Sequence, residues 1–141
     1  MEKRNVLFVM SSLRNGGAER SLVNLLQLYN VDLLLFQNEG MFLKQVPKAV
    51  NIISNCNKLY TLYDNNKAEA LKHPYLSAVH MIGTFISRKK TNSVAKSRQY
   101  RWEHFYKKIV PELTKEYDVA IAYMQREQTY FLVDKVKAAK K

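Results

Sequence analysis

The sequence predicts an α/β fold, a doubly wound parallel sheet in three layers, on three observations. An unbroken apolar run, Asn5–Met10, leads through a glycine turn into leucines at helical spacing. A second apolar run begins almost directly after that helix, which is the strand–helix–strand unit of a parallel sheet. A matching run, Asp118–Tyr123, precedes a further helical segment near the end of the chain. Repetition of this unit predicts helices on both faces of one sheet.

Length and composition limit the possible fold and function classes. The chain has 141 residues with 47% hydrophobic residues, the size of a single packed domain. Its 23 Lys and Arg residues exceed its 12 Asp and Glu residues, so the net charge of +11 favours anionic partners. The lone cysteine, Cys56, excludes an internal disulfide framework. Val6–Met10 is too short for the apolar core of a secretory signal, so we expect a cytoplasmic location.

The first half of the chain supplies three strands. After the strand Asn5–Met10, the helix from Ala18 has Leu22, Leu25, Leu26 and Tyr29 on one face. The run Val31–Phe36 predicts a second strand. A loop, a short helix over Met41–Val46 and Pro47 lead to a third strand, Val50–Ile53.

The second half is expected to be mainly helical. Residues 54–67 are polar and predict no firm element. A helix from Pro74 to about Ser87 is expected to bury one apolar face, formed by Tyr75, Val79, Ile82 and Ile86. After the polar stretch Arg88–Ser93, a long helix with Trp102, Phe105, Tyr106 and Ile109 on one face is expected to end or kink at Pro111. The strand Asp118–Tyr123 and a helix over Thr129–Ala139 complete the prediction.

The glycine turn is the most informative motif. Gly16 and Gly17 lie between a strand end and a helix start, where free backbone N–H groups favour an anion or a sugar pressed against the main chain. We expect the pair to permit positive φ angles and close ligand approach. No dinucleotide fingerprint or Walker A pattern is present. The alternative is that the two glycines merely close a tight turn.

The residues around this turn resemble a known family. Ser11–Arg20 reads S-S-L-R-N-G-G-A-E-R, and the run Asn5–Leu26 around it resembles the amino-terminal signature of family 4 retaining glycosyltransferases of the GT-B fold. The run Tyr117–Tyr123 is similar to a later strand of that family. The resemblance is strongest in the first 40 residues and around residues 117–124.

The resemblance implies a domain of a larger enzyme. Such enzymes pair two Rossmann-like domains, of which the first receives the acceptor and the second holds the nucleotide-sugar with two glutamates separated by seven residues. No two glutamates of this sequence have that spacing. We therefore expect residues 1–141 to be the amino-terminal acceptor-binding domain, with the carboxy-terminal donor domain missing and no activity alone. The full enzyme would transfer a hexosyl unit from a nucleotide diphosphate sugar to a cell-surface polysaccharide or lipid-linked acceptor, without a metal or other cofactor.

The resemblance also assigns substrate-binding residues but no catalytic residue. The assigned residues are Asn15, Gly16, Gly17, Glu19, Arg20, Met124, Gln125 and Arg126. For Glu19 the alternative is a helix cap, because a carboxylate is favoured at a helix N-terminus. For the segment after Tyr123 the alternative is an ordinary loop. The three histidines, His73, His80 and His104, lack metal-ligand spacing, so no metal site is expected.

A basic segment supplies the second feature. Between residues 88 and 108 the chain has eight basic residues and one acidic residue, which accounts for +7 of the net +11. Together with an aromatic stripe this segment is expected to dock peripherally on an anionic membrane, at the inner face of the plasma membrane. The residues assigned to this surface are Arg88, Lys89, Lys90, Lys96, Arg98, Arg101, Trp102, Lys107 and Lys108.

Three alternatives stay open for this segment and this fold. The segment is equally well explained as a solvated helix face with its aromatic residues in the core. A basic α/β module that binds nucleic acid is the second function considered, although no recognised nucleic-acid motif supports it. A flavodoxin-like regulatory domain is a weaker possibility, because the acidic pair of a phosphoacceptor does not follow the first strand.

Overall fold

The computed structural model describes residues 5–53, 62–63 and 67–141, and it divides the chain into two compact units. The sheet unit comprises Met1–Asn55 and Glu112–Lys141. The helical unit comprises Cys56–Pro111, which lies between the two stretches of the sheet unit in the sequence.

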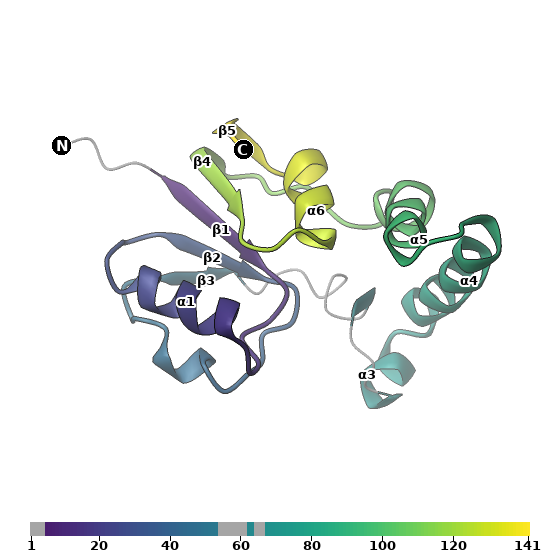
Figure 1. The fold of residues 1–141 in the computed structure, drawn as a ribbon, viewed down its shortest axis with the longest axis horizontal. Helices are drawn as coiled ribbons and strands as arrows, with labels where there is room; N and C mark the ends of the chain where they lie inside the picture. The colour runs from purple at the N-terminus through teal and green to yellow at the C-terminus, as the bar shows by residue number, and fades with distance from the viewer. Residues whose placement is uncertain (1–4, 54–61, 64–66) are drawn as a thin grey trace. The chain divides into compact units, whose positions relative to one another are not determined.

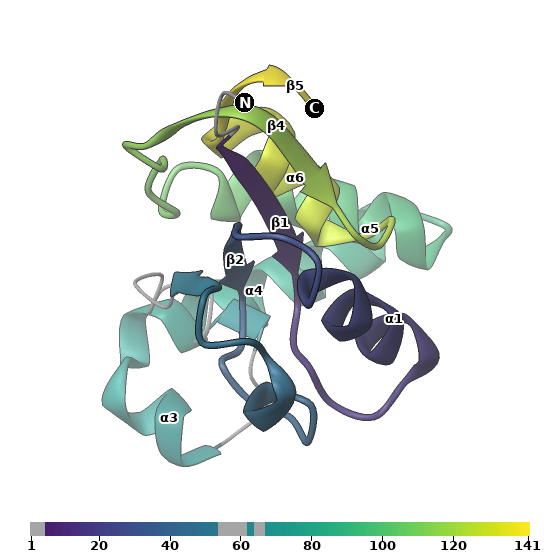
Figure 2. The same cartoon turned by 90° about the vertical axis from the view of Figure 1, so that its left-hand side faces the viewer.

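The sheet unit has the Rossmann-like α/β fold that the sequence predicts. All five strands pair in parallel in the order β3-β2-β1-β4-β5, so that β1 lies between β2 and β4 (Figures 1 and 2). The strands are β1 (Val6–Met10), β2 (Asp32–Leu35), β3 (Asn51–Ile53), β4 (Glu116–Ala122) and β5 (Lys137–Lys140).

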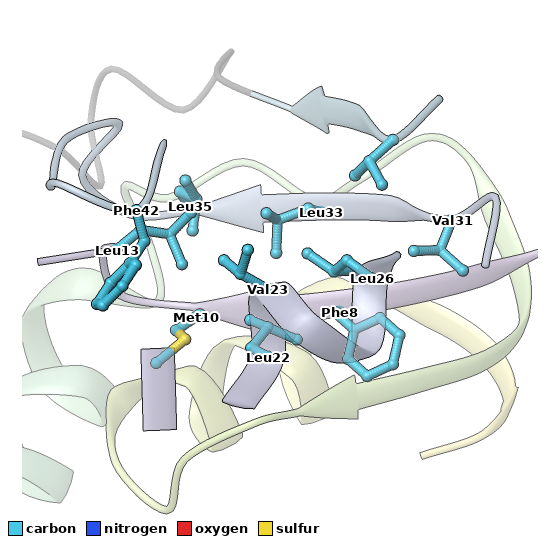
Figure 3. Close-up of a cluster of buried hydrophobic side chains, with 11 residues drawn as sticks. Phe8, Met10, Leu13, Leu22, Val23, Leu26, Val31, Leu33, Leu35 and Phe42 are labelled. Carbon is cyan, nitrogen blue, oxygen red and sulfur yellow. The ribbon is translucent and has the colours of Figure 1, made fainter. Parts of the chain in front are cut away.

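Helices cover both faces of this sheet. They are α1 (Gly17–Leu26), the short 3-10 helix η1 (Leu43–Gln45) and α6 (Glu127–Lys135). The step from β1 to β2 runs toward the β3 edge of the sheet, and the step from β4 to β5 runs toward the opposite edge. Because both crossovers are right-handed, their helices, α1 and α6, lie on opposite faces of the sheet. On one face, Leu22, Val23 and Leu26 of α1 point toward the strands (Figure 3). On the other, the Phe131 ring of α6 packs edge-on against Phe36, with centroids 5.6 Å apart.

The helix expected over Thr129–Ala139 is wrong in its last part. It ends at Lys135, and Lys137–Lys140 forms β5 instead. Ala and Lys have high helix propensity, but pairing with β4, where Tyr117 lies opposite Ala138, outweighs that local preference.

The helical unit contains α3 (Lys67–Lys72), α4 (Pro74–Lys90), α5 (Val94–Arg101) and the π-helical segment η2 (Trp102–Tyr106). The start of α4 at Pro74 agrees with the prediction, but the helix continues three residues beyond Ser87. The sequence did not predict α3. The expected long helix through Ile109 is also wrong, because the chain widens into η2 after Arg101 and leaves regular helix at Tyr106.

The face that α4 buries differs from the expected one. Tyr75 and Ile82 are 68% and 54% exposed, whereas Leu76, Gly83 and Ser87 are the buried residues of the helix. A Cβ at Gly83 would lie 3.3 Å from the ring of Phe105, and the Ser87 hydroxyl bonds that of Ser97 at 2.8 Å. The small residues Gly83 and Ser87 therefore face η2 and α5 and allow close packing. Of the expected face, Tyr75 and Ile82 are exposed, and Val79 and Ile86 are partly buried.

Candidate functional site

Two loops are hydrogen-bonded to each other at the carboxyl edge of the sheet, where β1 and β2 end. The Leu13 N–H donates to the Glu39 carbonyl at 3.0 Å, and the Phe42 N–H donates to the Leu13 carbonyl at 3.2 Å. Gly40 makes this possible, because its φ of 126° is left-handed and a Cβ there would collide with the Leu13 carbonyl. The backbone of the loop after β1 is thereby fixed.

The expectation of positive φ angles at the diglycine is wrong. Gly16 is extended, with a φ of −166°, and precedes α1 as its N-cap, and Gly17 is the first residue of the helix. Of the glycines that the structure describes, Gly40 is the one with a positive φ. A Cβ at Gly17 would meet no atom within 4 Å, and the residue is exposed. The main chain of Gly17 is therefore exposed, and whether a ligand approaches it stays a prediction.

Glu19 occupies the start of α1. A Cβ at Gly16 would collide with the Glu19 carboxylate, which shows that this side chain folds back over the first turn of the helix. A carboxylate there is stabilised by the positive end of the helix dipole. The position is that of a dipole-stabilising residue at the helix start, and it makes the turn a poor phosphate site, because a second anion would face Glu19. Hydroxyl groups, in contrast, would find an acceptor.

The second predicted segment lies beside the first. β4 pairs with β1, and Tyr123 directly after it bonds α1 through a 2.9 Å contact between its hydroxyl and that of Ser21. The Tyr123 ring packs edge-on against Phe8, with centroids 6.2 Å apart, and Met124 packs against the core under α1. Gln125 and Arg126 are exposed. The structure thus places the residues assigned in both segments on neighbouring loops of one edge.

An ion pair at this edge was missed from the sequence. Arg14 and Glu39 pair across the two loops, with the Arg14 Nε donating to Glu39 Oε1 at 2.6 Å. The side chains are 60% and 36% exposed, so both remain accessible to a ligand. The two residues lie 25 positions apart, and no local pattern links them.

A buried polar cluster at the opposite, amino edge of the sheet was also missed. Asp32, 7% exposed, accepts hydrogen bonds from Lys115 Nζ and the Tyr117 hydroxyl, both at 2.8 Å. Asn51 donates to its other oxygen at 3.3 Å. Burial alone would raise the pKa of the Asp32 carboxyl, but the three hydrogen bonds outweigh burial and lower it. Burial and the bond to Asp32 together raise the pKa of Tyr117.

The start of β4 supplies this cluster. Tyr117 and Ala120 lie on opposite faces of the strand and are both buried, as expected where helices cover both faces of a sheet. The N–H groups of Asp118 and Val119 both donate to the Asn5 carbonyl, at 2.9 and 3.4 Å. A hollow of about 220 Å³ adjoins the cluster and is lined in part by Asn5, Asp32 and Lys115.

The basic segment of the helical unit is only partly as expected. Six of its eight basic side chains are exposed, and Arg98 and Arg101 are partly buried. Trp102 is 1% exposed and Tyr106 2%, so the assignment of Trp102 to a membrane surface is wrong. Its burial agrees with the alternative in which the aromatic residues of this segment lie in the core.

No family model, curated protein sequence or solved structure matches the chain. Within residues 5–53, 62–63 and 67–141, no helix is long and apolar enough to cross a membrane. No group of three potential metal-ligating side chains was found in that same part of the chain. Cys56 lies outside the described residues.

Proposed function

We propose that the carboxyl edge of the sheet binds a sugar acceptor for a nucleotide-sugar-dependent retaining glycosyltransferase. The observation that supports this most is Gly17, which offers exposed main chain with open space where a side chain would stand. It begins α1 at the carboxyl edge of an open parallel sheet, the edge at which ligands of such folds gather.

The polar groups at this edge suit a polyhydroxyl ligand. The Arg14–Glu39 pair, the Glu19 carboxylate and the exposed side chains of Asn15 and Gln125 provide both donors and acceptors. Carboxylates accept hydrogen bonds from sugar hydroxyls, and they disfavour a phosphate at the same point. The nucleotide diphosphate of the donor is therefore proposed to bind elsewhere in the enzyme. These residues position the acceptor hydroxyl, and catalytic groups are not assigned among them.

A substitution at Gly17 separates binding from folding. Gly17→Leu would place a side chain at an exposed position where a Cβ meets no atom within 4 Å, so the fold should persist while acceptor binding falls at least about tenfold. Asn24→Leu, an exposed position two turns later in α1, is the matched control and should bind as the parent chain does. Saturation-transfer NMR with a panel of glycans measures both. Equal binding by the two variants would contradict the proposal. Incubation with nucleotide-sugars should give no transfer or hydrolysis.

The helical unit is proposed to dock on an anionic membrane surface. The apolar side of this surface is an outward stripe of α4 that we call the α4 stripe, formed by Tyr75, Ile82 and Phe85, which are 68%, 54% and 61% exposed. Residues 75, 82 and 85 share one side of the helix, opposite the buried Gly83 and Ser87. Lys89 continues the stripe, with its Nζ 4.4 Å from the centre of the Phe85 ring. Apolar side chains next to lysines are the composition of an interfacial helix.

Vesicle binding tests the docking proposal. Burying one such apolar side chain is worth about 1.5–3 kcal/mol, and each lysine near an anionic leaflet adds about 1 kcal/mol. Phe85→Ser should therefore weaken binding to phosphatidylserine-containing vesicles about tenfold or more. The control is Leu28→Ser, which removes a leucine of the sheet unit that is 73% exposed. Equal losses in the two variants would contradict the proposal, as would tighter binding to single-stranded DNA than to vesicles.

A further inference from the structure

The turn between α4 and α5 encloses a hollow of about 360 Å³ in which arginine side chains converge. We call it the arginine hollow. Its lining residues are Arg88, Thr91, Asn92, Ser93, Val94, Ser97, Arg98 and Arg101. Three of these eight side chains are guanidinium groups, three bear hydroxyls, and none is acidic. We propose that the arginine hollow is a binding site for a phosphate group.

The walls of the hollow are held by hydrogen bonds within the helical unit. The Ser87 and Ser97 hydroxyls bond at 2.8 Å where α4 and α5 pack together. Thr91 Oγ1 donates to the Ser87 carbonyl at 2.7 Å, which fixes the start of the turn. Arg101 is fixed from α4, because its Nη1 donates to Thr84 Oγ1 at 2.9 Å. The turn and the Arg101 side chain are therefore held in place before a ligand binds, which lowers the cost of ordering them.

Arg101, which lines the hollow, has one donor without a partner. Its Nε is buried and has no hydrogen-bond partner among the described residues. A buried donor without an acceptor is costly. Thr84 holds the other side of the guanidinium, by accepting from Nη1.

The start of α5 adds backbone donors to the same hollow. Ser93 is the N-cap and its side chain accepts from the Lys96 N–H at 3.2 Å. The N–H group of Val94, which lines the hollow, has no intrahelical acceptor because it lies in the first turn. The first turn of α5 contains no acidic residue, in contrast to α1 with its Glu19. The positive end of the helix dipole is therefore uncompensated at α5.

These features together select phosphate. Guanidinium groups bind phosphate through paired charge-assisted hydrogen bonds, and a helix N-terminus adds N–H donors of the same polarity. The volume exceeds that of one phosphate and leaves room for part of the group that bears it. This chemistry is shared by a phosphomonoester lipid headgroup and a soluble phosphate or diphosphate. The inference concerns the helical unit and does not depend on the sugar site of the sheet unit.

The test uses the whole chain, paired variants and two kinds of probe. Arg88→Gln/Arg98→Gln removes two charges from the hollow, and Lys107→Gln/Lys108→Gln removes two exposed charges that are not among its lining residues. Circular dichroism establishes that both variants are folded. Calorimetry with inorganic pyrophosphate should show binding that the arginine variant weakens at least about tenfold and the lysine variant leaves within about twofold. Equal weakening in both variants, or no binding by the parent chain, would overturn the proposal.

Vesicles distinguish the two sources of phosphate. Phosphatidylcholine vesicles containing phosphatidic acid are compared with vesicles containing phosphatidylserine, at matched surface charge. A preference for phosphatidic acid that disappears in Arg88→Gln/Arg98→Gln supports the site and identifies a lipid headgroup as its ligand. Equal binding to both vesicles, together with arginine-dependent pyrophosphate binding, supports the site and identifies a soluble ligand. A phosphatidic acid preference that survives in the arginine variant contradicts the site.

Discussion

Removal of the Asp32 carboxylate should destabilise the sheet unit more than any other single change in its polar network. Asp32 joins three parts of the unit, because it accepts from Asn51 at β3, from Lys115 and from Tyr117 at β4. Asp32→Ala deletes all three hydrogen bonds and leaves the buried Tyr117 hydroxyl without its acceptor. The cost is dominated by that hydroxyl.

The magnitude follows from the exposure of each partner. A hydrogen bond to a charged group contributes about 1.5–3 kcal/mol when both partners are buried, which applies to Tyr117. The Lys115 side chain is 51% exposed, so its ion pair is worth less than about 1 kcal/mol. We therefore expect losses of about 3 kcal/mol for Asp32→Ala, about 1.5 kcal/mol for Tyr117→Phe and below about 1 kcal/mol for Lys115→Ala.

Urea unfolding followed by far-UV circular dichroism measures these losses. The order of the three variants is the result that matters, because absolute contributions of hydrogen bonds vary with context. If Lys115→Ala costs as much as Asp32→Ala, the exposed ion pair rather than the buried hydroxyl dominates, and the reasoning is refuted. A loss below about 1 kcal/mol for Asp32→Ala would refute it as well.

Three further predictions follow from single residues. The pKa of Asp32 lies below its ordinary value of 3.8, so the stabilisation by this carboxylate is complete above pH 3.8 and is lost as pH falls through the folded-state pKa. The difference in unfolding free energy between the parent chain and Asp32→Asn should therefore become smaller in urea titrations at acid pH. A difference that stays constant with pH would contradict the hydrogen-bonded carboxylate. Burial, with a contribution from the Arg101 charge, lowers the pKa of His80 below its ordinary 6.5, so the helical unit should lose stability as pH falls below about 6.5. His80→Gln should reduce this pH dependence of the unfolding free energy, measured by Trp102 fluorescence. An unchanged pH dependence would count against a half-buried neutral ring at His80. Gly40→Ala should lower the free energy of unfolding in urea by about 2 kcal/mol or more, because the φ of Gly40 is 126° and a Cβ there would collide with the Leu13 backbone. Gly17→Ala should be neutral or stabilising. Similar effects at both glycines would contradict the contact between Gly40 and Leu13.

The order of the sheet elements could be predicted because their signals are local. The strand Val6–Met10 is visible as an unbroken apolar run, and α1 as leucines at helical spacing. Short connections between these elements leave few possible topologies for the sheet. β5 could not be predicted in this way, because Lys-Ala-Ala-Lys has no strand-forming side chain and becomes a strand through pairing with β4. The outward face of α4 was missed for a related reason, since Gly83 and Ser87 pack by being small rather than apolar.

The candidate sites also differ in how far apart in the sequence their residues lie. Gly16 and Gly17 form a contiguous motif, so their place at a strand–helix turn was predicted, although their φ angles were not. The Arg14–Glu39 pair and the Asp32 cluster join residues 19 to 85 positions apart, and only the tertiary fold brings them together. Contacts of that range leave no pattern in one sequence. The arginine hollow could be predicted only in part. Its residues are close in sequence, but they come together only through the turn between α4 and α5.

Chemical-shift mapping with glycan acceptors tests the proposed sugar site most directly. The expected result is a set of shifts confined to the amides of Asn15, Gly16 and Gly17 and of the loop 123–126, with a response that saturates. Shifts instead at Asn5, Asn51 and Lys115 would place the ligand at the amino edge of the sheet and contradict the account. So would spectra that no glycan changes.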